Sequence, residues 1–341
     1  MGERVNILFT SVGRRVGLVQ AFRRAMEGLG VEGRLLAADR SALAPAFHLA
    51  DEGFLVPRVE APDYVDALLA ICRRHRIGLV VPLIDWELQV LAEARGRFAA
   101  AGTRLLVSSP AVTRICRDKK ATCEFLRARG LGAPRVLSCA EAANGPFPLI
   151  VKARYGSSAR NVTRVADAEG LRWACRGGDD LIIQECLAGP EFTVDVYAGL
   201  GGGPRVAVPR RRLQVRGGEV VKALTVRSEA VIEAALRVVA ALGECVGVIT
   251  CQCRQAPSGE VKFFDLNPRF GGGVPLAIRA GADFPRWILE EHLGRKPDID
   301  PAKWESGLLM LRYDAEVFCR QDALPTGKWA PGDLEDDEDP A

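Results

Sequence analysis

Apolar runs alternate with amphipathic stretches over the first third of the chain. We predict strands over residues 4–10, 34–38, 53–56, 77–82 and 104–108, and helices over 15–29, 63–76 and 86–101. Strands that alternate with helices are typical of βαβ units, in which the strands form a parallel sheet. The pattern therefore predicts an α/β domain with a parallel sheet, ending near residue 110.

From Pro110 the pattern changes to a helical stretch, predicted over 112–129, followed by shorter strands joined by tight turns. Further strands are predicted over 148–153, 162–165, 181–186, 192–197, 205–208, 220–226, 246–254 and 260–266, with helices over 168–176 and 228–242. Hairpins combined with helices indicate α+β units. The tail from Pro325 is acidic and contains Pro and Gly, so we expect it to be disordered at its end.

Composition narrows the class of protein. With 341 residues and 48% hydrophobic content, the chain can form about two or three packed units. Its 46 basic and 43 acidic residues are spread along the chain, which argues against nucleic-acid binding. No apolar run reaches the roughly 18 residues of a membrane span, and the N-terminus lacks a signal-peptide pattern. We therefore expect a cytoplasmic protein with no membrane partner.

The ten cysteines and three histidines do not have metal-ligand spacing, because no CxxC pair occurs and the histidines lie far apart. Reduced thiols packed as small hydrophobic groups are the expected state. A dinucleotide site is not expected either, because TSVGRRVG lacks the closely spaced glycines of G-x-G-x-x-G. Arg14 and Arg15 open a helix, where they are either solvated or bind a substrate carboxylate.

The stretch FFDLNPRFGGG, residues 263–273, carries the most specific chemistry. Asp265 and Asn267 lie two apart on a predicted strand, so their side chains project from one face. Carboxylate and amide oxygens are ligands that Mg²⁺ takes together with nucleotide phosphates. Arg269 would extend towards a developing negative charge, and the glycines would let the backbone approach a ligand closely. Taken alone, the stretch could also be a capped turn.

Two other segments supply candidate nucleotide contacts. Lys152 lies in the apolar strand PLIVKA, before a Gly/Ser loop of the kind that can bind phosphate through backbone N–H groups. Lys119, before a helical run, would offer a second cation, although an edge-strand lysine and a hairpin turn explain Lys152 equally well. In LIIQECLAGPEF, Gln184 and Glu185 end a strand, where they could contact a purine. Glu191 follows a turn, where it could accept hydrogen bonds from a ribose or simply be solvated.

The order of these segments resembles the ATP-grasp superfamily, and within it a single half of the carbamoyl-phosphate synthase large subunit. The resemblance implies a Rossmann-like preceding domain over 1–110, two ATP-grasp subdomains over 111–188 and 189–315, and a tail over 316–341. It also implies ATP as co-substrate with Mg²⁺. The nucleotide contacts implied are Lys119, Lys152, Ser157, Ser158, Gln184, Glu185, the Leu187 backbone and Glu191. Asp265 and Asn267 would hold the metal, and Arg269 would stabilise an acyl phosphate.

Two departures from the family pattern concern the metal. Asp265 stands where glutamate is usual and is one methylene shorter. In the upstream strand VITCQC, Gln252 fits as a second ligand, but Thr250 could occupy that position instead. Catalysis with one tightly held ion is therefore an open alternative to catalysis with two.

By resemblance, the chain is expected to be an ATP-dependent ligase that joins a small carboxylate and an amine through an acyl phosphate, and to form a homodimer. The candidate substrate contacts are Arg14, Arg15, Asp85, Glu87, Arg212, Arg216 and Lys222. A phosphotransferase that makes a phosphorylated, carbamoyl-phosphate-like product and a non-catalytic nucleotide-binding protein stay open. The identities of the acid and the amine are also open.

Overall fold

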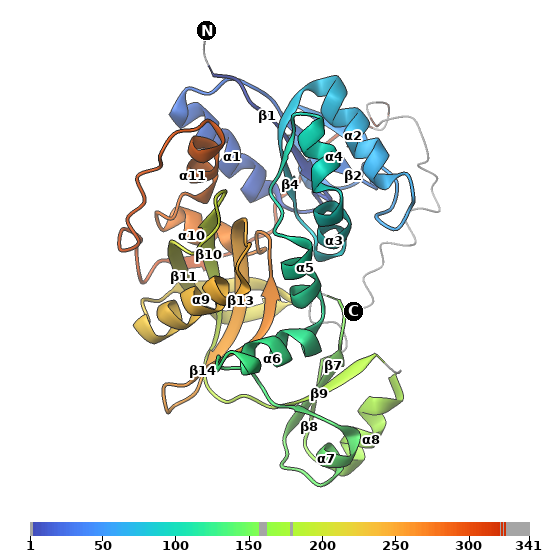
Figure 1. The fold of residues 1–341 in the computed structure, drawn as a ribbon, viewed down its shortest axis with the longest axis vertical. Coiled ribbons are helices and arrows are strands. Elements are labelled where there is room, and N and C mark those ends of the chain that lie inside the picture. Colours follow the sequence, from blue (N-terminus) through green and yellow to red (C-terminus); the bar gives the residue numbers. More distant parts are fainter. Residues whose placement is uncertain (1–2, 157–161, 178–179, 321, 323, 325–341) are drawn as a thin grey trace. The chain divides into compact units, whose positions relative to one another are not determined.

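The computed structural model describes residues 3–156, 162–177, 180–320, 322 and 324 (Figure 1). The predicted disordered tail end and the two serines Ser157 and Ser158 lie outside these residues. The chain divides into two units. The first contains the residues up to Val107 together with Leu289–Lys296, and the second contains Ser108–Ile288 with Pro297–Arg312.

The first unit contains a five-stranded parallel sheet in the order β3-β2-β1-β4-β5. Its elements are β1 (Asn6–Thr10), α1 (Val16–Leu29), β2 (Leu35–Asp39), η1 (Pro45–Leu49), β3 (Glu52–Leu55), α2 (Tyr64–His75), β4 (Ile77–Pro82), α3 (Asp85–Glu93), α4 (Arg95–Ala100) and β5 (Arg104–Leu105). The strand order reverses between β1 and β4, and crevices outside the carboxyl ends of strands at such a point commonly bind ligands.

The second unit contains two antiparallel sheets. The four-stranded sheet, order β6-β9-β7-β8, is formed by β6 (Val136–Leu137), β7 (Leu149–Ala153), β8 (Thr163–Val165) and β9 (Leu181–Glu185). The six-stranded sheet, order β14-β13-β10-β11-β12-β15, is formed by β10 (Glu191–Gly199), β11 (Val206–Arg216), β12 (Glu219–Thr225), β13 (Gly247–Gln255), β14 (Val261–Asn267) and β15 (Leu309–Leu311). This mixture of parallel and antiparallel sheets confirms the predicted fold class.

The helices of the second unit pack against its two sheets. They are α5 (Pro110–Arg117), α6 (Lys119–Ala128), α7 (Cys139–Ala143), α8 (Ala168–Ala174), η2 (Cys175–Gly177), α9 (Glu229–Leu242) and α10 (Val274–Arg279), while α11 (Phe284–His292) spans both units. Residues of α5, α6 and α9 (Figure 1) form the apolar core against β10, β13 and β14. Cys251 and Cys253 are free thiols inside this core, and burial raises the pKa of both.

The predicted helix over 112–129 is two helices, because Asp118 separates α5 from α6. Asp118 has an extended backbone, and its side chain accepts hydrogen bonds from the amides of Lys120 and Ala121. An aspartate that caps the next helix in this way interrupts the preceding one. The predicted helix over 86–101 is likewise α3 and α4, which meet at Ala94. None of the helices in the described residues has the length and apolar character needed to cross a membrane.

Candidate functional site

The face of the six-stranded sheet opposite the apolar core carries a polar band. Two rows of paired residues lie on this face: Asp265–Gln252–Thr193–Arg210 crosses β14, β13, β10 and β11, and beside it Asn267–Thr250–Asp195 crosses β14, β13 and β10. Residues paired across antiparallel strands project from the same face. Asp195 and Arg210 are completely or almost completely buried, and Thr250 is also buried. Because buried polar groups are costly unless they are bonded, this band is not an ordinary core face.

A β-bulge puts Asp265 on the polar face. Gln252 lies opposite Asp265, but the next residue, Cys253, lies opposite Phe263, so Phe264 is an extra residue in β14. A bulge changes which face the following side chains occupy. Without it, Asp265 would share the face of Phe263, which is buried in the core. The bulge is thus the local feature that assembles the site.

Asp265 and Asn267 lie side by side on this face, with the Asn267 amide donating to the Asp265 carboxylate at 3.0 Å. Gln252 is the residue directly opposite Asp265, whereas Thr250 is opposite Asn267 and bonds to protein groups. One carboxylate and two amide side chains form an oxygen-rich set that fits a Mg²⁺ ion held mainly by nucleotide phosphates. The described residues contain no cluster of three or more His, Cys, Asp or Glu suited to a metal.

Lys152 of β7 reaches this site from the other sheet. Its side chain is 5% exposed, and Nζ donates to the carbonyl of the bulged Phe264 at 3.2 Å. Burial lowers the pKa of Lys152, and the opposite effect of the nearby Asp265 carboxylate offsets this only in part. A buried lysine needs an anionic partner, and Asp265 is the charged group that most opposes the effect of burial on its pKa.

Lys119 lies at the start of α6 and donates from Nζ to the carbonyl of Gly156 at 2.5 Å, immediately before the predicted phosphate loop. Its backbone N–H donates to the carbonyl of Arg154. Arg154 also forms a bidentate pair with Asp118, the residue that caps α6. Burial alone would raise the pKa of Asp118, but bonds from Arg154 and the helix amides lower it overall. These contacts tie Lys119 to the end of β7.

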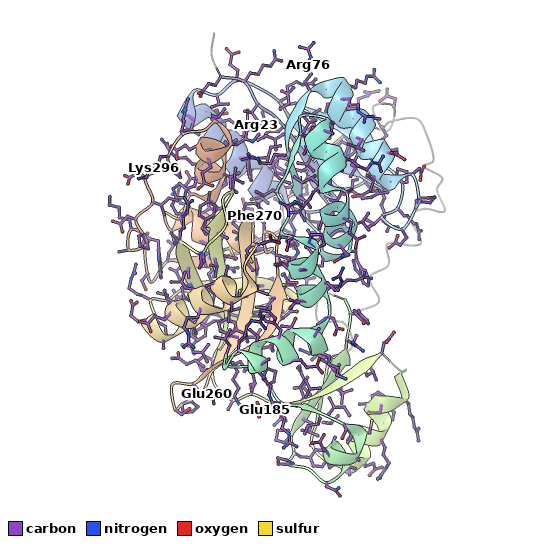
Figure 2. All side chains as sticks on the ribbon, in the orientation of Figure 1. Arg23, Arg76, Glu185, Glu260, Phe270 and Lys296 are labelled. Carbon is purple, nitrogen blue, oxygen red and sulfur yellow. The ribbon has the colours of Figure 1, made fainter. Side chains whose placement is uncertain are left out.

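The segment from β9 to β10 contains the predicted purine contacts. Gln184 is buried, and its amide donates to the sulfur of Cys123. Glu185 accepts from Lys262 Nζ at 2.7 Å and from the backbone N–H of Arg135 at 3.1 Å. Figure 2 labels Glu185 and Glu260, the two carboxylates that Lys262 joins. Leu187 follows β9 and is half-buried.

Glu191, the predicted ribose contact, starts β10 and pairs with two arginines. Arg212 Nε lies 3.3 Å from one carboxylate oxygen, and Arg254 Nη2 lies 2.8 Å from the other. A carboxylate can accept about four hydrogen bonds, so these pairs leave capacity for ribose hydroxyls. Arg212, predicted as a substrate contact, thus lies beside the predicted nucleotide residue. Arg216 and Lys222 are exposed on the neighbouring part of the β11–β12 hairpin.

Arg269 follows β14 and donates from Nη1 to the carbonyl of Phe270 at 3.0 Å, with Nη2 3.5 Å from the Asn267 amide oxygen. Two of the glycines after it lie against side chains of the same chain. A Cβ on Gly271 would lie 2.9 Å from Thr250, and one on Gly273 would lie 2.2 Å from Arg210. The described contacts that require glycine here are with the chain's own buried side chains.

In the first unit, the predicted substrate residues occupy the loops after β1 and β4. Arg14 is exposed and Arg15 is half-buried at the start of α1, while Asp85 begins α3. Glu87 is completely buried, and its carboxylate accepts from Tyr64, Ser11 and the amides of Leu83 and Ile84. Burial raises the pKa of Glu87. This residue has no exposed surface for a substrate and instead fixes the start of α3.

Sequence reasoning missed Asp195, the burial of Arg210 against it and the pairing of Arg254 with Glu191. A charged residue inside the apolar run FTVDVYAG was the available signal for Asp195. Arg210 lies in a basic run that has the composition of an exposed segment. Alternate residues of a strand face opposite sides, so such a run can still place one arginine on a buried face.

Comparison with known families matches two parts of the chain. Residues 7–106 match the family described as "PylC-like, N-terminal domain", and residues 178–315 match "ATP-grasp in the biosynthetic pathway with Ter operon". Lys119 and Lys152 lie between the two matched parts. These matches confirm the ATP-grasp resemblance seen in the sequence.

Individual proteins support the same fold. A D-alanine–D-alanine ligase from Ectopseudomonas mendocina (strain ymp) is 33% identical over 126 residues, which is 34% of this chain and 38% of the ligase. The chain thus matches well under half of that relative. A Campylobacter jejuni biotin carboxylase in a β-γ-ATP complex has a TM-score of 0.71 at 14% identity, covering 89% of this chain and 74% of the other. An L-amino acid ligase from Bacillus licheniformis has a TM-score of 0.67 at 18% identity, covering 86% and 75%.

Proposed function

Because the chain combines a PylC-like N-terminal domain with an ATP-grasp domain, we propose that it is an ATP-dependent carboxylate–amine ligase. The observation that carries the proposal is the hydrogen bond from Lys152 Nζ to the carbonyl of Phe264, the bulged residue of β14 next to Asp265. A buried lysine, a carboxylate and amide oxygens on one face form a suitable environment for a polyphosphate with its counter-ion. The ligases among the relatives support the reaction class.

In the proposed first step, a carboxylate oxygen of the acid attacks the γ-phosphorus of ATP. The bond from that phosphorus to the β–γ bridging oxygen breaks, and ADP leaves with the electron pair. Lys119 and Lys152 offset the negative charge on the phosphates through both steps of the reaction. Arg269 is proposed to orient and stabilise the acyl phosphate.

In the second step, the amine attacks the acyl carbon, the bond from carbon to the phosphate oxygen breaks, and phosphate leaves as the nitrogen loses a proton. Asp265, with Asn267 and Gln252, would hold Mg²⁺, which would neutralise phosphate charge when bound. Gln184, Glu185 and the Leu187 backbone are proposed to hold adenine, and Glu191 the ribose. Neither proposed step requires a side chain of the described residues to act as a nucleophile.

The substrates are proposed to be a small acid and a small amine. Arg14, Arg15 and Asp85 of the first unit and Arg212, Arg216 and Lys222 of the second stay candidate contacts, because they offer charge at half-buried or exposed positions. Glu87 is removed from this set because it is completely buried. A homodimer stays a prediction from the resemblance.

The test is a screen of amino acids, singly and in pairs, for ADP release by the purified protein. The proposed ligase releases ADP only when both a carboxylate and an amine are present. A single amino acid supplies both groups, so release with a carboxylic acid that carries no amine, and with no amine added, would indicate a phosphotransferase instead. Lys152→Met is the matched control, because methionine keeps the length and removes the charge.

A non-catalytic nucleotide-binding protein is the second candidate. The observation that favours it is that Asp265 is the single carboxylate among Asp265, Asn267 and Gln252. Tight binding of two Mg²⁺ ions would need more negative charge than one carboxylate provides. ATP binding by calorimetry, without ADP release under any substrate pair, would support this candidate.

A further inference from the structure

A completely buried ion pair lies on the polar face next to the segment that carries Arg269. Asp195 is 0% exposed and Arg210 is 1% exposed. Arg210 donates from Nε to Oδ2 of Asp195 at 2.6 Å and from Nη2 to Oδ1 at 3.1 Å. A bidentate pair of this kind has a fixed geometry, but burying it contributes little net stability. Stability alone therefore does not explain why the pair is present.

Thr250 connects this ion pair to the backbone of Arg269. Its hydroxyl lies 2.9 Å from the carbonyl oxygen of Arg269 and 3.3 Å from Oδ1 of Asp195. The same side chain packs against Gly271, where a Cβ would lie 2.9 Å from both Oγ1 and Cγ2 of Thr250. One buried threonine thus contacts the segment both before and after Phe270, which Figure 2 labels.

Arg210 fixes the far end of the same segment. A Cβ on Gly273 would lie 2.2 Å from its Nη1, so the guanidinium lies directly against the Gly273 backbone. Nη1 is buried and has no hydrogen-bond partner within the part of the chain that the structure describes. Since Nε and Nη2 are held by Asp195, the guanidinium cannot turn away from the glycine without losing that pair.

We propose that Thr250, Asp195 and Arg210 form a positioning network that fixes the segment from Asn267 to Gly273 and thereby aims Arg269. The network acts through the backbone and touches no substrate. Its effect on turnover rests on the function proposed above, whereas its effect on the order of Arg269 does not. A misplacement of about 1 Å at a positioned group can cost about 10²-fold in rate.

Thr250→Val tests the network, because valine keeps the shape and removes the hydroxyl. We expect kcat to fall by about 10- to 100-fold with KM for ATP unchanged. Thr250→Ser should restore most of kcat, because serine returns the hydroxyl. The matched control is Thr103→Val: Thr103 is 2% exposed, compared with 3% for Thr250, and its hydroxyl donates to the carbonyl of Ile77 at 2.8 Å. A loss of kcat in the control as large as in Thr250→Val would overturn the proposal.

The second measurement does not depend on turnover. The Arg269 Nε–Hε signal in a ¹⁵N spectrum is assigned by its loss in Arg269→Lys. We expect a sharp signal in the wild type and in Thr103→Val, and a shifted or broadened one in Thr250→Val. An unchanged signal in Thr250→Val would refute the network even if the wild type is an active ligase. If the wild type releases no ADP with any substrate pair, the proposed function fails, while this signal still decides the positioning role.

Discussion

Gly273→Ala is the most specific perturbation of the polar face, because the new methyl group would meet a side chain that cannot move freely. The added Cβ would lie 2.2 Å from Arg210 Nη1 and 2.8 Å from Cγ1 of Val220. Arg210 must move by about 1 Å to restore ordinary contact, and overpacking of this kind costs about 1–3 kcal/mol. If Arg210 releases Asp195, the unpaired buried carboxylate raises the cost to about 3–5 kcal/mol.

The assay is the free energy of unfolding from urea titration, measured beside kcat for the same preparation. The matched control is Gly201→Ala, because a Cβ there meets nothing within 4 Å and the backbone is not in the left-handed region. We expect Gly273→Ala to be less stable than this control by the amount above and to lose activity as well. Equal stability of the two variants, within about 0.5 kcal/mol, would refute the close contact with Arg210.

The other predictions concern the phosphate and metal residues and the assembly. Lys152→Met should weaken ATP binding strongly without unfolding the protein, and near-native affinity by calorimetry would rule out the phosphate role. Burial lowers the pKa of Lys152 from 10.5, so its charge is fully present below the lowered pKa and is lost as the pH rises through it. Wild-type ATP affinity should therefore fall before the pH reaches the ordinary lysine value, whereas Lys152→Met should lack this fall. Asp265→Asn should lower magnesium-dependent turnover by about 10²-fold, and Asp265→Glu should be milder, because only the latter keeps the charge. The reverse order would indicate that Asp265 only caps a turn. The protein should be a homodimer, and a mass near 36.9 kDa by light scattering would contradict this.

The sequence predicted those parts of the fold and site that depend on local patterns. The parallel sheet of the first unit follows from alternating apolar and amphipathic segments. Asp265 and Asn267 share a face because they are two apart on a strand, which needs no tertiary information. The bulge at Phe264, which selects that face, depends on pairing with β13 and has no signature in β14 alone.

Features that depend on long-range pairing were not predicted. β11 continues to Arg216, well beyond the predicted end at Val208, because pairing with β10 and β12 offsets the poor strand pattern of its basic run. The burial of Arg210 needs Asp195, a partner on another strand. Glu87 has the composition of a substrate contact, and only the tertiary structure shows that it is buried against Tyr64.

The most direct test of the proposed chemistry follows the oxygen atoms of the acid. With a substrate pair found by the screen, the acid is supplied with ¹⁸O in its carboxylate, and the released phosphate is analysed by mass spectrometry. Ligation through an acyl phosphate transfers one carboxylate oxygen to phosphate, because the carbon–oxygen bond breaks in the second step. We predict one ¹⁸O atom in each phosphate released. Phosphate without ¹⁸O, released as the product forms, would contradict the acyl-phosphate mechanism.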